Sequence, residues 1–406
     1  MKFFRNLLER REFSLQRWET FLDGLGQASS SGVQVSDATA LTWAIVWGCV
    51  TVLMQDMAKI PLPVYRRLGR DGSGGREEAA DYYLWPVLRH QANPFMTAAV
   101  FKGTMQGHLA TGGNAYAYIQ RKPTGEVEAL WPRHPSSITP RVKNGEVVYE
   151  YNSDGQRWVY GADEIFHLRG MSRDGVVGMS PVEIFRDGIG LGLGYQQHAS
   201  HTFRNSARPS LIGSFPNAQI GKEKADEIAQ ALTKQNAGIP NAGKILVTYG
   251  GLDLKPWGFS NKDAEFIESR RLSNEDACRI WRMPPHKVMD YTKSAYANMA
   301  VSDEAYVNDT LRFWQVTWEE EVMAKLIRPD ERSTYYSEHD NSALLKGTPK
   351  ERAEVEEIYV RSGISNINEV RRSHNWRPVE GGDINRVQAQ MIDITAPAPA
   401  HEQPTT

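Results

Sequence analysis

Residues 303–326 carry an amphipathic pattern in which apolar side chains recur at steps of three and four. This spacing places them along one face of an α-helix. The apolar stripe, which we call the packing seam, consists of Val307, Leu311, Trp314, Trp318 and Val322. A different face carries only polar side chains, namely Glu304, Asn308, Arg312, Gln315 and Glu319. The pattern predicts a helix with one side packed against protein and the other facing water or a charged partner.

A second helix is predicted just before this one, over residues 261–283. Pro284 and Pro285 end it, because proline lacks an amide donor and clashes with the preceding turn. A polar loop therefore joins the two helices, and its side chains include Tyr291, Thr292, Lys293, Ser294, Tyr296 and Asn298. Lys293 is the sole basic residue between Tyr291 and Val307.

Further helices are predicted over residues 41–59 and 97–111. The sequence Ser180-Pro181-Val182-Glu183 combines an N-cap serine, a proline at the first helical position and a glutamate at the third. These residue types favour a helix start. We therefore expect a helix that begins at Pro181 and runs to about Asn205.

Between residues 114 and 169 the hydrophobic period changes to two, and the turn sequences PTG, KNG and SDG separate short β-rich runs. This pattern predicts an antiparallel meander of five or six strands. A small α/β insert follows over residues 209–257. Beyond it, STYYSEHD predicts a returning strand, and residues 348–362 and 366–373 predict two short helices.

Composition places the 406-residue chain among ordinary globular proteins with two to four structural units. The net charge of -2 argues against tight, nonspecific binding of nucleic acid. The most apolar run, LTWAIVWGCVTVLM, is too short to cross a membrane, and no secretory signal is expected at the N-terminus. Cys49 and Cys278 are the only cysteines, which excludes a disulfide framework or zinc cluster and fits a reducing compartment.

The run GIGLGLG places four glycines, Gly188, Gly190, Gly192 and Gly194, inside the helix predicted from Pro181. Its spacing differs from GxGxxG, and no strand-to-helix turn precedes it. Close approach of another helix or of a subunit is therefore a better interpretation than phosphate binding.

Other candidate chemical groups also have simple structural interpretations. His198 and His201 share a helix face but lack a third metal ligand. His167 is interpreted as a packed strand histidine. Glu319, Glu320 and Glu321 are consecutive on a helix, so they splay apart and are expected to face solvent. No catalytic residue, metal or cofactor is predicted.

A set of longer motifs occurs in order between about residues 40 and 385. They include AIVWGCVTVLMQDMAKIPLPVYRR, ATGGNAYAYIQR, EALWPRHPSSITPRV, DEIFHLRG, DGVVGMSPVEIFRDGIGLGL, TFRNSARPS, NAGKILVTYGGLDLKPW, RRLSNEDACRIWRMPPHKVMD and SNINEVRRSHNWRPVEGGD. This ordered set resembles the portal proteins of tailed bacteriophages, in the branch typical of the Hong Kong phage type.

The resemblance implies an α+β portal protein that forms a ring, typically of twelve identical subunits, at one vertex of the capsid in the virion. Double-stranded DNA would pass through the ring during packaging and ejection, with weak and nonspecific contacts. The implied partners are the large terminase subunit during filling, a head-tail connector protein afterwards, and the major capsid or scaffold protein. No membrane is involved, and assembly takes place in the host bacterial cytoplasm.

Composition predicts a flexible N-terminal arm and a disordered C-terminal tail. The resemblance also implies how the chain between these two segments is divided. The expected parts are the arm (1–36), the β-rich wing (37–180), a first stem helix (181–208), a small α/β clip (209–257), a second stem helix (258–285), the tunnel loop (286–302), the tunnel helix (303–328), a wing return strand (329–345), the helical crown (346–392) and the tail (393–406).

In this scheme the polar loop residues named above would line the DNA channel. The packing seam would contact the wing or a neighbouring subunit. The candidates for docking the packaging motor lie in the clip and are Lys222, Glu223, Lys224 and Lys234. Two alternatives stay open, a nucleotide-dependent enzyme that uses the run from Gly188 to Gly194, and a non-viral ring-forming structural adaptor.

Overall fold

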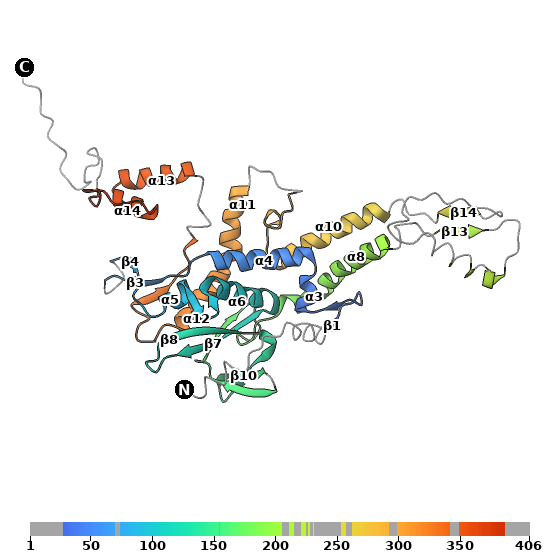
Figure 1. Cartoon of the computed structure of the whole chain (residues 1–406), viewed down its shortest axis with the longest axis horizontal. Coiled ribbons are helices and arrows are strands. Elements are labelled where there is room, and N and C mark those ends of the chain that lie inside the picture. The colour runs from blue at the N-terminus through green and yellow to red at the C-terminus, as the bar shows by residue number, and fades with distance from the viewer. Residues whose placement is uncertain are drawn as a thin grey trace, which may run out of the picture. The chain divides into compact units, whose positions relative to one another are not determined.

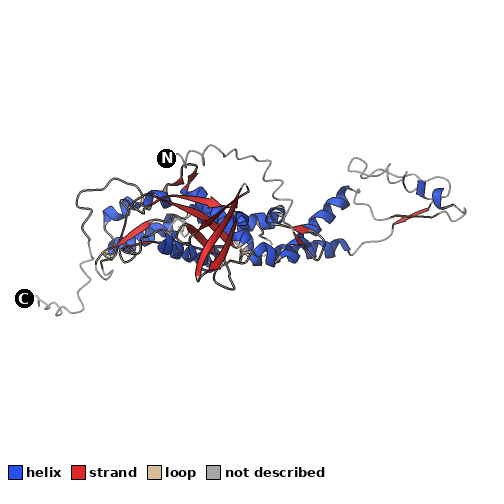
Figure 2. Cartoon of the chain, turned by 90° about the horizontal axis from the view of Figure 1, so that it is seen from below, coloured by secondary structure: helices blue, strands red, loops and turns tan. Residues whose placement is uncertain are grey.

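The structure, a computed structural model, combines helices with antiparallel sheets (Figures 1 and 2). It describes residues 27–69, 74–153, 155–204, 211–214, 221–224, 226–227, 230, 253–256, 262–291, 299–341 and 349–385. The chain forms two compact units, Met1–Asp340 and Asn341–Thr406, which we call the first and second units. No helix in the described ranges is both long and apolar enough to span a bilayer.

The first unit begins with a small hairpin of β1 (Gln27–Ala28) and β2 (Gln34–Val35). The expectation of a flexible arm up to residue 36 is therefore wrong for this hairpin, and residues 1–26 lie outside the described part. The amide of Ser30 donates to Asp187 Oδ1 at 2.8 Å, which holds the hairpin on a later helix.

Helices α4 (Ala44–Lys59) and α6 (Ala98–Gly112) pack against each other at the centre of the first unit, and the short α3 (Asp37–Leu41) precedes them. The helix predicted over 41–59 thus begins a few residues late, while the one predicted over 97–111 is confirmed. Thr97 caps the start of α6, and Gly113 ends it with a left-handed φ of 69°. A side chain at Gly113 would also overlap the backbone of Met179, so only glycine fits there.

All six strands predicted between residues 114 and 169 are present, but not as one meander. Strands β12, β7 and β8 form an inner sheet in that order, and β11, β10 and β9 form a separate outer sheet. Their bounds are β7 (Asn114–Arg121), β8 (Val127–Arg133), β9 (Ile138–Lys143), β10 (Glu146–Ser153), β11 (Gln156–Tyr160) and β12 (Ile165–Arg169).

The single-meander prediction fails because β12 returns to pair with β7, with Ile165 opposite Tyr118. A short 3-10 helix, η1 (Pro135–Ser137), separates β8 from β9. The inner strand β12 is almost wholly buried, whereas β9 is mostly exposed. The rest of the protein therefore covers β12 of the inner sheet more completely than β9 of the outer sheet.

A third sheet has the order β15-β3-β4 and links distant parts of the first unit. It consists of β3 (Val64–Arg67), β4 (Arg76–Glu78) and β15 (Tyr335–Ser337). Tyr335 pairs with Arg66, which confirms the predicted return strand. Between β4 and α6 lie α5 (Trp85–Arg89) and a small pair formed by β5 (Gln91–Asn93) and β6 (Met96–Thr97), and both α5 and β5 contact β8.

The helix predicted from Pro181 is confirmed at its start, where Ser180 Oγ accepts from the amide of Glu183 at 3.2 Å. It is interrupted at Phe185, which separates α7 (Pro181–Ile184) from α8 (Arg186–Arg204). Helix α10 (Lys262–Ile280) runs beside α8 (Figure 1). In the insert between them, β13 (Leu211–Ser214) pairs with β14 (Asp253–Pro256).

The helix predicted over residues 303–326 is observed as three consecutive helical segments. They are α11 (Met299–Ala305), the π-helix η5 (Tyr306–Leu311) and α12 (Arg312–Lys325). A π-helical turn inside an α-helix is uncommon and often lies at a functional site.

The second unit contains α13 (Pro349–Arg361) and α14 (Ile367–Ser373), which confirms the two short helices predicted there. Gly363, with φ of 73°, lies between them, and Asn366 forms a capping box with Glu369. Only Asn366, Asn368 and Gly382 are buried among its described residues. The described part of this unit thus buries no apolar side chain.

Candidate functional site

The two ends of the predicted loop are tied together by four side chains that we call the loop clamp: His286, Lys287, Ser302 and Asp303. His286 Nε2 lies 2.9 Å from Asp303 Oδ1, and Lys287 Nζ lies 2.7 Å from the same oxygen. Ser302 Oγ lies 3.4 Å from His286 Nδ1. The clamp joins the short helix η3 (Pro285–Val288) to the first helix after the loop.

Two opposing effects act on the carboxyl group of Asp303. Partial burial would raise its pKa, but the hydrogen bonds from Lys287 and His286 prevail and lower it. Asp303 is therefore ionised at neutral pH and can hold both partners by charge-assisted bonds. Met289 follows η3 with a left-handed φ of 64°, which turns the chain toward the loop.

The structure describes one of the six candidate loop residues. Tyr291 is exposed at the start of the loop. Thr292, Lys293, Ser294, Tyr296 and Asn298 lie outside the described residues. The structure therefore defines the base of the loop, and the roles of the loop side chains stay predictions.

The packing seam lies against elements of its own chain. Val307, Leu311, Trp318 and Val322 are buried, and Trp314 is half-buried. The Trp318 ring meets Phe101 of α6 edge-on at 6.0 Å between centroids and lies 5.7 Å from Phe166 of β12. Its Nε1 donates to Gln106 Oε1 at 3.2 Å. The seam thus joins α12 to the central helices and the inner sheet.

Predictions about the polar side of this helix are wrong at three positions, one of which is Glu319, whose side chain is only 12% exposed and lies 2.9 Å from the buried His339. Gln315, which we expected on the polar face, is fully buried, and Glu321, which we expected to face solvent, is also buried. The reason is helical spacing, since Gln315 follows Leu311 by four residues and Glu321 follows Trp318 by three. Both positions therefore lie on the apolar face.

Glu321 finds polar partners inside the protein. One carboxylate oxygen accepts from the amide of His167 at 3.4 Å, and the other lies 3.5 Å from Arg169 Nη2. Burial nevertheless raises the pKa of Glu321. The Glu321 carboxylate therefore makes few polar contacts for a side chain that is this deeply buried.

His167 is a packed strand histidine, as predicted. It is 1% exposed, and its ring stacks on Tyr116 at 4.3 Å. Its Nε2 donates to Asn114 Oδ1 at 3.1 Å, so its Nδ1 is the acceptor for the Tyr149 hydroxyl at 3.2 Å. Burial lowers the pKa of His167, which keeps the imidazole neutral.

The glycine run lies within α8 and allows close approach by the N-terminal part of the chain. A Cβ at Gly190 would overlap Ser29, and one at Gly192 would overlap the buried Trp43 ring. The run is thus closely approached at Gly190 and Gly192, but by the hairpin and the residue before α4 and not by another helix or a subunit as predicted. The run does not form a phosphate-binding turn, because it lies inside a helix.

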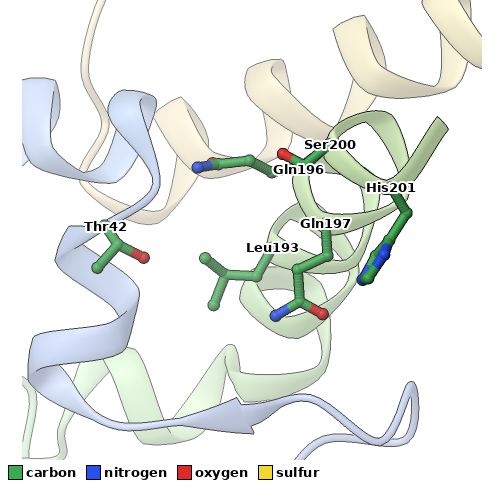
Figure 3. A pocket seen from close by; sticks show the side chains of 6 residues that line it. All are labelled: Thr42, Leu193, Gln196, Gln197, Ser200 and His201. Atoms are coloured by element: carbon green, nitrogen blue, oxygen red, sulfur yellow. The ribbon is translucent and has the colours of Figure 1, made fainter. Parts of the chain in front are cut away.

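A hollow of about 290 Å³ lies between Thr42 and the exposed side of α8 (Figure 3). The other lining residues are Leu193, Gln196, Gln197, Ser200 and His201. Most of these side chains carry neutral amide or hydroxyl groups. In the described ranges, no three His, Cys, Asp or Glu side chains gather in a way that could hold a metal.

The candidates for motor docking are only partly described. Lys222, Glu223 and Lys224 are exposed, and Lys234 lies outside the described residues. The structure therefore shows that three of these four side chains are accessible to solvent. Their role in docking stays a prediction.

Sequence reasoning missed two arrangements that depend on the tertiary structure. The loop clamp brings together charges from either side of the loop, which the polar residues flanking it could have suggested. The two cysteines also lie on helices that contact each other, Cys49 on α4 and Cys278 on α10. Nothing in the local sequence indicates that these two helices pack together.

The chain is similar to known proteins over most of its length. The portal protein of Enterobacteria phage HK97 is 28% identical over 364 residues, which cover 89% of this chain and 85% of that protein. A crystal structure of an HK97 family phage portal protein from Corynebacterium diphtheriae has a TM-score of 0.55 and 16% identity, covering 78% of this chain and 98% of that one. A chain in the neck of a native gene transfer agent (GTA) particle, computed with C12 symmetry, has a TM-score of 0.54 and 18% identity. The match covers 89% of this chain and 99% of that one.

The two solved structures agree with this chain in fold, with mixed helices and antiparallel sheets. The family model described as phage portal protein matches residues 44–375. This range includes the inner and outer sheets, α8, α10, the loop clamp and the packing seam. The chain belongs to the phage portal protein family.

Proposed function

We propose that this chain is the subunit of a ring at one vertex of a phage capsid, and that double-stranded DNA passes through the ring during packaging and ejection. The observation that carries this proposal is the family match over residues 44–375. A relative of similar length bears the name portal protein, and a similar chain occurs in the neck of a gene transfer agent particle.

The second unit supports assembly into a ring. Its described residues bury no apolar side chain, yet they expose Val355, Ile358, Tyr359, Ile364 and Trp376. Apolar groups that gather on a surface often mark an interface with another protein. In the proposed ring, further copies of this chain cover them. Twelve copies are supported by the C12 symmetry with which the similar neck was computed.

The proposed division of the chain follows the order of its elements. Residues 37–180 with the return strand in 329–345 form the wing. The stem consists of 181–208 and 258–285, and residues 209–257 form the clip. The adjacency of α8 and α10 supports a stem made of two helices. The clamp at its base supports 286–302 as a tunnel loop, followed by the tunnel helix (303–328) and the crown (346–392).

The proposed partners dock at one end of the ring and around its rim. The large terminase subunit and later a head-tail connector protein bind at the clip, where Lys222, Glu223 and Lys224 are exposed. The major capsid or scaffold protein surrounds the wing. Contacts with DNA are weak, because a chain of net charge -2 does not accumulate the cations that make binding to phosphates tight.

Electron microscopy of the purified full-length protein tests this proposal. We expect closed rings with a central channel, and no ATP hydrolysis by the protein alone. Single particles at every concentration and salt, even after co-expression with the capsid protein, would contradict the ring. ATP hydrolysis by the purified chain would favour the alternative of a nucleotide-dependent enzyme.

The role of the loop can be tested in particles that depend on this chain. If Lys293 lies near DNA, Lys293→Ala should change the yield of packaged DNA and the dependence of ejection on salt, because one fewer cation meets the phosphates. A matched control is Lys122→Ala, since Lys122 pairs with Glu126 in the wing. If both variants package and eject like the parent, Lys293 has no contact with DNA.

A further inference from the structure

Arg282, just after α10, has a left-handed backbone with φ of 52° although it is not a glycine. Its amide donates to the Arg279 carbonyl at 3.2 Å, and the amide of Met283 donates to the Cys278 carbonyl at 2.9 Å. These two bonds form the Schellman motif that ends many helices, and glycine usually occupies its left-handed position. Since the Cβ of other residues disfavours this conformation, the chain carries an arginine where a glycine would be less strained.

The surrounding structure holds the backbone of Arg282 in this strained conformation. Both sequence neighbours, Trp281 and Met283, are buried. The indole nitrogen of Trp281 donates to the Ala110 carbonyl at 2.8 Å, and Thr310 Oγ1 of η5 donates to the Arg282 carbonyl at 2.8 Å. The side chain of Arg282, in contrast, is exposed, and its guanidinium has no hydrogen-bond or salt-bridge partner among the described residues. Backbone strain of this kind often marks a functional position.

A cavity of about 340 Å³, which we call the Arg282 cavity, opens beside this side chain at the end of α10. Its wall includes the apolar side chains of Met283, Pro284 and Pro285. The charged residues that line it carry both signs and are Arg279, Arg282, Glu275 and Asp290. An apolar centre surrounded by polar groups is the usual composition of a protein–protein contact, and arginine is enriched among the residues that contribute most to such contacts.

The charges of the Arg282 cavity favour a protein over DNA as its partner. DNA presents phosphates, which the carboxylates of Glu275 and Asp290 would repel. A protein surface with both signs can match a lining with both signs. This chain is itself such a protein, with 47 Lys and Arg residues against 49 Asp and Glu residues. In a closed ring each copy contacts the next through two different surfaces, so a hollow on one copy can receive a side chain from the other.

We propose that the Arg282 cavity is a contact between neighbouring copies of this chain. An apolar side chain of the next copy enters the hollow, and the Arg282 guanidinium binds a carboxylate of that copy through two parallel hydrogen bonds. The fixed backbone places the arginine at the opening before the copies meet, so less conformational freedom is lost on association. The inference rests on the proposed ring and identifies one of its contacts.

Assembly of the full-length protein as a function of concentration, followed by sedimentation, tests the contact. Arg282→Gly and Arg282→Asn both tolerate the left-handed backbone and lack the guanidinium. We expect each variant to need about tenfold or more protein for half-assembly, as is typical when an interface arginine is removed. The melting temperature of unassembled Arg282→Gly should be no lower than that of the parent, because the strain is relieved. Arg89→Ser, which removes another exposed arginine at the end of α5, should assemble like the parent.

Several results would overturn the proposal. The first is assembly of both Arg282 variants at the parent's concentration. The second is a lowered melting temperature of Arg282→Gly together with lost assembly, because Arg282 would then stabilise only the subunit. The third is normal rings with an altered dependence of DNA packaging on salt, which would make Arg282 a phosphate contact. In the first and third cases the ring itself still stands. A parent that forms only small oligomers, whose association still requires Arg282, would contradict the ring and support the contact.

Discussion

Helix α12 and helix α13 have similar apolar stripes but opposite surroundings. The stripe of α12 is covered by α6 and β12 of the same chain, and Trp318 is fully buried. On α13, Val355, Ile358 and Tyr359 are each close to half exposed or more. Amphipathic spacing thus predicts that a helix has a face to bury, but the surrounding fold decides whether its own chain covers that face.

The second unit is held together mainly by polar contacts. The side-chain Nδ2 of Asn368 donates to the Val379 carbonyl at 3.0 Å and to Asp383 Oδ2 at 2.8 Å. The side-chain Oδ1 of Asn368 accepts from the backbone amide of Val379 at 2.8 Å. These bonds fasten the C-terminal segment to α14. Hydrogen bonds of this kind give a unit its shape while leaving its apolar surface available to further copies of the chain.

Truncation of the central tryptophan should give the largest effect. We expect Trp318→Ala to destabilise the first unit by about 3–5 kcal/mol, because it removes a buried indole and leaves a cavity. The measurement is the shift of the urea midpoint followed by circular dichroism. Phe313→Ala is the matched control, since Phe313 lies on the same helix and is exposed. Equal losses of stability in both variants would mean that the buried packing seam contributes no more to stability than an exposed position on the same helix.

The second largest effect is expected from acid, which should lower the stability of the first unit. His167 in the first unit has a lowered pKa, so the unfolded chain takes up a proton near pH 6.5 that the folded chain does not. The contribution of His167 to stability should therefore fall as pH drops below about 6.5, by at most about 1.4 kcal/mol per pH unit. Urea midpoints at pH 7 and pH 5 measure this loss.

The control for the acid effect is His167→Gln, which retains an amide donor for Asn114 but has no group that titrates in this range. Its stability at pH 7 will differ from that of the parent, so the comparison concerns the change between pH 7 and pH 5. A change as large in the variant as in the parent would show that other groups cause the acid sensitivity.

Removal of the Asn368 amide should loosen the second unit alone. We expect Asn368→Ala to cost about 1–2 kcal/mol, because the backbone amide and carbonyl of Val379 lose their buried partner. Hydrogen exchange should increase over residues 349–385 and stay unchanged around α12. Faster exchange in both units would contradict the view that each unit is stabilised by its own contacts.

A substitution on the exposed face of α13 should have the smallest effect on stability and a large effect on assembly. Ile358→Ser is expected to change stability by less than about 0.5 kcal/mol, as is usual for surface positions. Light scattering should nevertheless show fewer rings. Lys350→Ser on the same helix is the control, because its side chain is exposed and polar. Normal rings from Ile358→Ser would exclude this face from the interface.

Local signals in the sequence predicted elements and their ends well. Ser180 caps α7 with its own side chain as expected, and the helix predicted over residues 97–111 is observed over Ala98–Gly112. Each feature depends on residues within a few positions of one another. The same locality explains why all six strands between residues 114 and 169 were predicted from their alternating pattern.

Errors arose where distant segments meet. The pairing of β12 with β7 split the expected meander, whereas the burial of Gln315 and Glu321 follows from their spacing to Leu311 and Trp318 on the same helix. The candidate site was predicted in outline, as a loop between two long helices. Its clamp of His286, Lys287, Ser302 and Asp303 became visible only once both ends of the loop were placed in space.

By itself, the sequence determined the helices and strands, the resemblance to portal proteins and the position of the loop, because these follow from local spacing and ordered motifs. The tertiary structure alone decided which apolar faces are covered, which charges meet at the loop base and that α4 contacts α10. The physical reason is that packing free energy depends on contacts between residues far apart in the chain. The periodicity of one segment does not indicate which distant segment packs against it.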